Sequence, residues 1–86
     1  MNAIRGRMDM RRLVGRNVRK YRLGKGLTQE QLAEACGFGQ NYLSDLERGR
    51  RNPTVVTLWE ISQALGVTPV DLITPDGGET GAADSA

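Results

Sequence analysis

Residues 35–46, ACGFGQNYLSDL, interrupt a helical pattern with two glycines, Gly37 and Gly39, and resume it at once. Glycine readily adopts the left-handed conformation that ends a helix, and it is tolerated as the residue that precedes a new one. The outward positions of the resumed helix carry amide, hydroxyl and carboxylate groups instead of the lysines and glutamates typical of a solvated face. The stretch therefore predicts two short helices joined by a turn of about 3–4 residues, the second of them suited to hydrogen bonding with a partner.

The same signals for helix ends recur along the chain. An expected start combines a capping residue with a flanking hydrophobic pair, as in Leu27, Thr28 and Leu32, and Gln31 completes a capping box with Thr28. Glycines follow the expected helix ends. No segment alternates apolar and polar residues as a strand does. The sequence predicts an all-α fold, a compact bundle of five helices over residues 10–24, 29–36, 40–48, 55–65 and 69–74.

Apolar residues at helical spacing define the core that we expect for this bundle. Trp59 widens the stripe of the fourth helix. The expected core positions are Met10, Val14, Val18, Tyr21, Leu32, Ala33, Cys36, Val55, Leu58, Trp59, Ile61, Leu65, Val70, Leu72 and Ile73.

The composition is that of one globular domain, with 86 residues, of which 38% are hydrophobic and 26% charged. No apolar run approaches the ~20 residues that cross a bilayer, and the first residues lack the apolar segment of a secretory signal, so we expect a cytoplasmic protein. The chain has one cysteine, Cys36, and no histidine. We therefore expect no metal site, no cofactor and no enzymatic activity, because the usual ligands and the usual acid–base group are missing.

The net charge of +2 conceals an uneven distribution. Residues 1–74 contain all 12 basic residues and 7 of the 10 acidic ones, which leaves a charge of +5, whereas residues 75–86 are acidic. We expect residues 9–74 to form the folded, basic domain, and a polyanionic partner would suit it. Residues 1–8 are interpreted as a flexible basic arm, with a groove-binding arm as the alternative, and residues 75–86 as a disordered Gly/Ala-rich tail.

The third expected helix carries a pattern typical of base recognition. Tyr42, Leu43 and Leu46 fall within one arc of roughly 100°, which predicts the buried side. Gln40 and Asn41 lie opposite, at the N-terminal end. An amide donates and accepts at once, which matches N6 and N7 of adenine, and a helix-turn-helix presents the first residues of its second helix to base edges. The alternative is a solvated face that is merely rich in amides.

The run LTQEQLAEACGFGQNYLSDLERGRRNPTVVTLWEISQALGVTPVDLI, residues 27–73, resembles the lambda-repressor/Cro-type helix-turn-helix family, also called the XRE family. The matching elements are LTQ..LA, G.G, YLS.LERG, RNP and ALGV, in that order and at the right spacing, and the resemblance covers about residues 13–73. It implies a DNA-binding domain of the lambda repressor-like fold. The DNA-binding residues that it implies are Gln29, Gln40, Asn41, Tyr42, Ser44, Asp45, Arg50, Arg51 and Asn52.

The resemblance also implies a role for each of these residues. Gln40 and Asn41 match the main base-reading positions, and Ser44 and Asp45 match groove-facing positions one turn later. Gln29 matches a residue that touches phosphate and braces the first side chain of the recognition helix.

Other implied roles concern the DNA backbone and the stability of the fold. Asp45 departs from the pattern, since phosphates repel a carboxylate, and we expect it either to accept a hydrogen bond from a cytosine N4 amine or to pair with Arg48. For Tyr42 we expect either that its hydroxyl contacts a phosphate or that its ring only packs against the core. The loop residues Arg50, Arg51 and Asn52 match positions that grip the DNA backbone, or else form a solvated turn. Arg22 and Glu47 match a structural ion pair.

These features predict a sequence-specific regulator of transcription that binds double-stranded DNA. The resemblance implies a homodimer on a palindromic operator, and we expect its dimer surface on the fifth helix and the exposed part of the fourth, including Val56 and Trp59. The alternatives are the antitoxin of a toxin–antitoxin pair, with a protein partner, or a restriction–modification controller. A different class, a protein-interaction module, is the remaining alternative.

Overall fold

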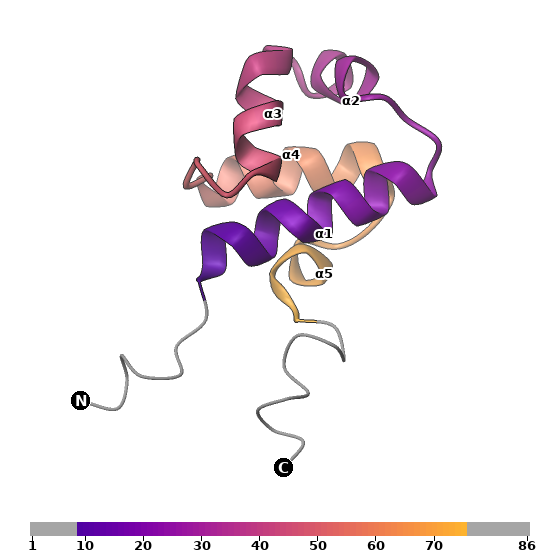
Figure 1. Cartoon of the computed structure of the whole chain (residues 1–86). Coiled ribbons are helices and arrows are strands. Elements are labelled where there is room, and N and C mark those ends of the chain that lie inside the picture. The colour runs from indigo at the N-terminus through magenta and orange to yellow at the C-terminus, as the bar shows by residue number, and fades with distance from the viewer. Residues whose placement is uncertain (1–8, 76–86) are drawn as a thin grey trace, which may run out of the picture.

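The computed structural model describes residues 9–75, which fold into five helices (Figure 1). The helices are α1 (Met10–Gly24), α2 (Gln29–Cys36), α3 (Gln40–Glu47), α4 (Val55–Leu65) and α5 (Pro69–Ile73). The described residues contain no strand. The expectation of an all-α bundle is confirmed, although α3 and α5 each end one residue earlier than the sequence predicts. The arm predicted for residues 1–8 lies outside the described residues, as do residues 76–86 of the predicted tail.

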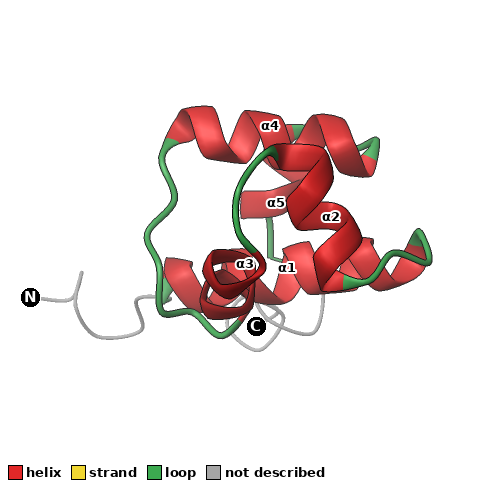
Figure 2. Cartoon of the chain, turned by 90° about the horizontal axis from the view of Figure 1, so that it is seen from above, coloured by secondary structure: helices red, strands yellow, loops and turns green. Residues whose placement is uncertain are grey.

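The long helix α1 lies between α3 and α5, and it contacts both. Viewed from above in Figure 2, α2 and α3 form an angled pair, with α4 on the far side of the molecule from α3. Helices α2 and α4 also contact each other, which closes the bundle. This arrangement leaves one side of α3 facing outward, away from all four of the other helices (Figure 1).

Four of the five helices begin with a side-chain cap. The side chain of Asp9 accepts a hydrogen bond from the backbone N–H of Arg11, and Thr54 does the same for Thr57. Thr28 forms the expected capping box with Gln31, and Thr68 forms another with Asp71. These caps satisfy N–H groups that have no partner inside the helix, which explains why short helices start where they do.

The core is smaller than the apolar pattern predicts. It consists of the buried hydrophobic residues Leu13, Val14, Val18, Leu32, Ala33, Leu43, Leu46, Ile61, Leu65 and Leu72. Tyr21, Cys36 and Leu58 pack against its edge and are partly buried. Leu13 was not expected in the core.

Five residues predicted for the core are exposed instead. Val55 and Val70 are 78% and 62% exposed, Trp59 is 53% exposed, and Met10 and Ile73 are 45% and 40% exposed. These residues lie at the start of α1, at the start and outer side of α4, and on α5. In a bundle this small each helix buries only a narrow side, so an apolar stripe wider than that side extends onto the surface.

A buried amide on α1, which is not among the expected core positions, connects the first helix of the domain to the last. Asn17 on α1 is 1% exposed, and its Nδ2 donates to the carbonyl oxygens of Leu72 and Thr74 at 2.9 and 3.1 Å. Carbonyl groups at the end of a helix have no partner within it. Asn17 therefore satisfies the end of α5 and fixes that helix to α1.

A glycine allows the close approach of α1 and α3. A Cβ atom added to Gly15 would overlap the carbonyl oxygen of Leu46 and would lie 2.7 Å from that of Glu47. These atoms are backbone and belong to the last turn of α3, so they cannot move away as a side-chain tip can. Only glycine at position 15 lets the two helices pack at this distance.

We expect Gly15→Ala to lower the free energy of unfolding by about 1–3 kcal/mol, because the added methyl group must push α1 and α3 apart. Urea denaturation followed by circular dichroism measures the change. Gly24→Ala is the matched control, since a Cβ at that exposed helical position meets nothing within 4 Å. A Gly15→Ala protein as stable as the Gly24→Ala protein would contradict the close contact.

Candidate nucleic-acid interface

The turn between α2 and α3 is built by two glycines with different roles. Gly37 has a φ of 80°, in the left-handed region, and the N–H groups of Gly37 and Phe38 both donate to the carbonyl of Ala33, at 2.9 and 3.1 Å. Gly39 is extended, with a φ of −79° and a ψ of 154°, and precedes α3 without a side-chain cap. The turn therefore ends α2 and redirects the chain within three residues, as a helix-turn-helix requires.

Helix α3 is held by its buried side and exposed on its polar side. Leu43 and Leu46 are fully buried in the core. Gln40 and Asn41, at the N-terminal end, are exposed, and Ser44 and Tyr42 are partly buried. The structure thus places the two amides at the free end of a helix whose position is fixed by two leucines.

The ring of Tyr42 packs at the turn. It meets Phe38 edge to face, with the ring centroids 5.0 Å apart and an angle of 65° between the planes. Aromatic pairs in this geometry contribute about 0.5–1.5 kcal/mol beyond the area they bury. Tyr42 therefore has a structural role in fixing the start of α3, whatever its hydroxyl contacts.

Arg22 and Glu47 form an ion pair across the α1–α3 contact. Arg22 Nε lies 2.7 Å from Glu47 Oε2, and Arg22 Nη2 lies 3.0 Å from Glu47 Oε1. The two side chains are only 8% and 3% exposed, and Arg22 Nη1 also donates to the carbonyl of Leu27 at 2.9 Å. The bidentate geometry and the extra hydrogen bond satisfy charges that burial would otherwise destabilise strongly.

Gln29 joins this pair rather than the start of α3. Its Nε2 donates to Glu47 Oε1 at 3.0 Å. The resemblance implies that Gln29 braces the side chain of Gln40, but in this structure the residue that it braces is Glu47. One carboxylate therefore links the start of α2, the last turn of α1 and the last turn of α3.

Asp45 pairs with Arg51, which corrects the pair with Arg48 that was one of the two expectations for this carboxylate. Arg51 Nη2 lies 3.5 Å from Asp45 Oδ2, and the Arg51 guanidinium lies over the Tyr42 ring, 5.4 Å from its centroid. Arg48 is the C-cap of α3 and is exposed. The chain instead turns back, because the N–H of Arg50 donates to the carbonyl of Asp45 at 2.9 Å, and this return brings Arg51 to α3.

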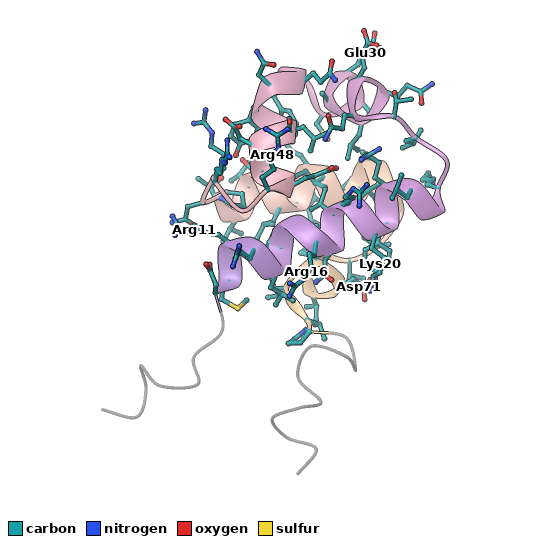
Figure 3. The ribbon with its side chains drawn as sticks, in the orientation of Figure 1. Arg11, Arg16, Lys20, Glu30, Arg48 and Asp71 are labelled. Atoms are coloured by element: carbon teal, nitrogen blue, oxygen red, sulfur yellow. The ribbon has the colours of Figure 1, made fainter. Side chains whose placement is uncertain are left out.

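Exposed arginines surround the end of α3. Arg48, Arg50 and Arg51 follow the helix directly. Arg12 belongs to the same group, since a Cβ added to Gly49 would lie 2.8 Å from Arg12 Cγ. Figure 3 shows Arg48 between α3 and α1, and Arg11 beside the loop after α3. Asn52, in that loop, is exposed as well.

Arg12 and Arg48 are not among the DNA-binding residues that the resemblance implies. The Arg11–Arg12 dipeptide was the available signal for α1. Its proximity to the loop depends on the packing at Gly15 and Gly49, which the sequence pattern alone does not specify.

The described residues offer no alternative site for metal chemistry or a reactive thiol. No group of three His, Cys, Asp or Glu side chains among residues 9–75 could hold a metal ion. Burial, with a smaller contribution from the charge of Glu60, raises the pKa of the Cys36 thiol to about 11. Cys36 is therefore a protonated, weakly reactive packing residue at neutral pH. None of the described helices has the length and apolar character needed to cross a bilayer.

The chain belongs to a known family of proteins with this motif. Its residues 18–72 match the model of the helix-turn-helix family HTH_3. The HTH-type transcriptional regulator y4dJ of Sinorhizobium fredii is 63% identical to it over 68 residues, which cover 79% of this chain and 88% of that protein. Control protein C.BamHI of Bacillus amyloliquefaciens is 46% identical over 66 residues, covering 76% and 82%.

A solved structure of a relative has the same fold and contains DNA. The restriction-modification controller protein C.Esp1396I, a tetramer in complex with its natural 35 base-pair operator, is similar with a TM-score of 0.67 and 36% identity. The match covers 73% of this chain and 83% of that one. The protein is accordingly a DNA-binding transcriptional regulator of the XRE, lambda repressor-like type, as the residues of its third helix and the turn before it indicate.

We expect Glu47→Ala to lower the free energy of unfolding by about 1–3 kcal/mol, because it leaves the buried guanidinium of Arg22 without its carboxylate. Thermal and urea denaturation measure the loss. Glu34→Ala, which removes an exposed carboxylate from α2, serves as the control and should change stability by only a few tenths of a kcal/mol, about the range of surface substitutions. Equal stabilities of the two variants would show that the Arg22–Glu47 pair does not support the fold.

Proposed function

We propose that this regulator binds a palindromic operator as a homodimer, with α3 of each copy in the major groove and with Gln40 and Asn41 reading base edges. The observation that carries the proposal is the position of these two exposed amides at the free N-terminal end of a helix fixed by Leu43 and Leu46. An amide side chain can donate to and accept from one adenine at once, which gives about 1–3 kcal/mol of discrimination per well-formed pair. The protein acts by binding in the cytoplasm and carries out no chemical step.

The residues around α3 suit contacts to the DNA backbone. Exposed Arg50 and Asn52 follow α3 in the loop, and we assign them, with Arg51, to phosphates on one side of the groove. We assign Gln29 to the other side, since it begins α2 and is held by Glu47. Such contacts supply most of the affinity without selecting a sequence.

The start of α3 and its middle turn complete the surface that faces the groove. Gly39 brings no side chain to the first N–H groups of α3, so these groups and the positive end of the helix dipole are available to a phosphate. We assign the Tyr42 hydroxyl to a phosphate as well. Ser44 and Asp45 lie one turn after Gln40 and Asn41 on the same side of α3, which assigns them to the groove as well.

Exposed apolar side chains on α4 and α5 support the homodimer. Val56 and Trp59 of α4 are 64% and 53% exposed, and Val70 of α5 is 62% exposed. A second copy would remove these side chains from water and would bring two recognition helices to half-sites about 34 Å apart along the duplex. A single module with few phosphate contacts binds one half-site weakly, so the dimer is needed for operator affinity.

Control of a restriction–modification system is the biological setting that the relatives favour. C.BamHI and C.Esp1396I, which are 46% and 36% identical to this chain, are named a control protein and a controller protein. This setting requires the same operator binding and alters none of the assigned contacts.

We expect Gln40→Ala to weaken binding to the selected operator by about 1–3 kcal/mol and to leave binding to random duplex nearly unchanged, because the amide contacts a base. The operator is first obtained by selection from a random duplex pool, and titrations then measure both affinities. Arg50→Ala is the contrasting variant, which should weaken both and reduce the slope of log K against log salt by about one unit. An equal loss on both duplexes for Gln40→Ala would remove this residue from base reading.

We expect Val56→Asp to shift the protein from dimer to monomer, since a carboxylate would be buried in an apolar contact. Sedimentation velocity at micromolar concentration measures the change, and circular dichroism verifies the fold. Leu23→Asp is the control because Leu23 is 52% exposed on α1, which is not part of the proposed dimer surface. A Val56→Asp protein that remains dimeric would place the dimer surface elsewhere.

A further inference from the structure

Asp45 holds the loop after α3 by both its backbone and its side chain. Its carbonyl accepts hydrogen bonds from the N–H groups of Arg48 and Arg50, at 3.1 and 2.9 Å. Its carboxylate lies 3.5 Å from Arg51 Nη2, and the two side chains are 33% and 50% exposed. The Asp45–Arg51 pair is therefore accessible to a ligand on the outward side of α3.

A second contact keeps Arg51 on this side of the helix. The guanidinium lies over the face of Tyr42, 5.4 Å from the ring centroid, and Phe38 fixes that ring from the edge. A cation over an aromatic ring at an exposed site is weakly stabilised. Loss of the carboxylate contact would thus leave Arg51 near α3 but free to turn its N–H groups toward a phosphate.

The carboxylate needs a hydrogen-bond donor if it enters a groove. An ionised carboxylate only accepts hydrogen bonds. In the major groove the amine donors are adenine N6 and cytosine N4, and adenine places an acceptor, N7, beside its amine. Cytosine N4 is therefore the base group that matches Asp45. Where the DNA has no cytosine at this position, the carboxylate faces phosphates and keeps Arg51 as its counter-ion.

We propose that the Asp45–Arg51 pair is a specificity switch: Asp45 retains Arg51 on most DNA sequences and exchanges it for a cytosine N4 amine at the operator, which frees Arg51 to bind a phosphate. The inference rests on the proposed placement of α3 in the major groove. It assigns Asp45 the specificity-determining role and Arg51 the role of a conditional phosphate contact. A cytosine in each half-site then strengthens both the base contact and the backbone contact.

A double-mutant cycle on random duplex tests the retention of Arg51. Asp45→Asn keeps the size of the side chain but removes its charge, and Arg51→Gln removes the cation. We expect Asp45→Asn to tighten random-duplex binding and to steepen the salt slope by about one unit, since one more phosphate is neutralised. In the Arg51→Gln background the gain should be smaller by about two- to fivefold, the range for exposed ion pairs.

Arg50 provides the matched cation for this cycle. It is exposed and adjacent to Arg51, and among the described residues its side chain has no ion pair with Asp45. The cycle of Asp45→Asn with Arg50→Gln should therefore be additive. Equal coupling of Asp45 to Arg50 and to Arg51 would show general charge repulsion and would overturn the proposal.

Site selection with the wild type and with Asp45→Asn tests the exchange for cytosine. The wild type should require a cytosine at one position of each half-site, and Asp45→Asn should lose that preference in favour of adenine, whose edge an asparagine amide matches. A preference unchanged by Asp45→Asn would overturn the proposal while leaving operator binding intact. Failure of the wild type to select any duplex would overturn the proposed function, and this inference with it.

Discussion

The buried carboxylate of Glu47 is the contact on which the rest of the structure depends. It accepts hydrogen bonds from Arg22 of α1 and from Gln29 of α2, while Glu47 itself ends α3. Three helices therefore meet at one charged group. The contact exists only because Gly15 lets α1 approach the carbonyl groups of Leu46 and Glu47. A buried ion pair is weak support for stability in general, but it is sensitive to geometry and so fixes how the helices cross.

This geometry explains how so small a domain holds α3 in a fixed position. Helix α3 has only eight residues, too few to be stable alone in water. Its buried side is held by Leu43 and Leu46, its start by the Phe38–Tyr42 contact, and its end by Glu47. The positions of the exposed amides of Gln40 and Asn41 are therefore set by the packing of α3. Little of their placement depends on the loop after α3, so the surface that we propose for base reading is already formed in the free protein.

The sequence predicts the helices well because their ends are marked locally. Capping residues such as Thr28 and Thr54 and the left-handed Gly37 and Gly66 define four boundaries by chemistry within a few residues. The core is predicted less well. Val55 and Val70 satisfy helical spacing but are exposed, because the number of sides that a helix buries depends on its neighbours. The candidate site is likewise predicted only in part. The polar side of α3 follows from helical periodicity, whereas the pairing of Asp45 with Arg51 depends on the path of the loop after α3, which the sequence pattern does not specify.

The amide of Asn17 has a consequence for the operator spacing that the proposed homodimer would accept. It fastens the last carbonyls of α5 to α1, and α1 is in turn locked to α3 through Arg22. A surface on α5 used for self-association would thus be rigidly connected to the helix that enters the groove. In a dimer of two such subunits the distance between the two α3 helices would be fixed. Half-sites moved apart by one base pair would then be bound more weakly because the protein is stiff, although every base contact would still be available.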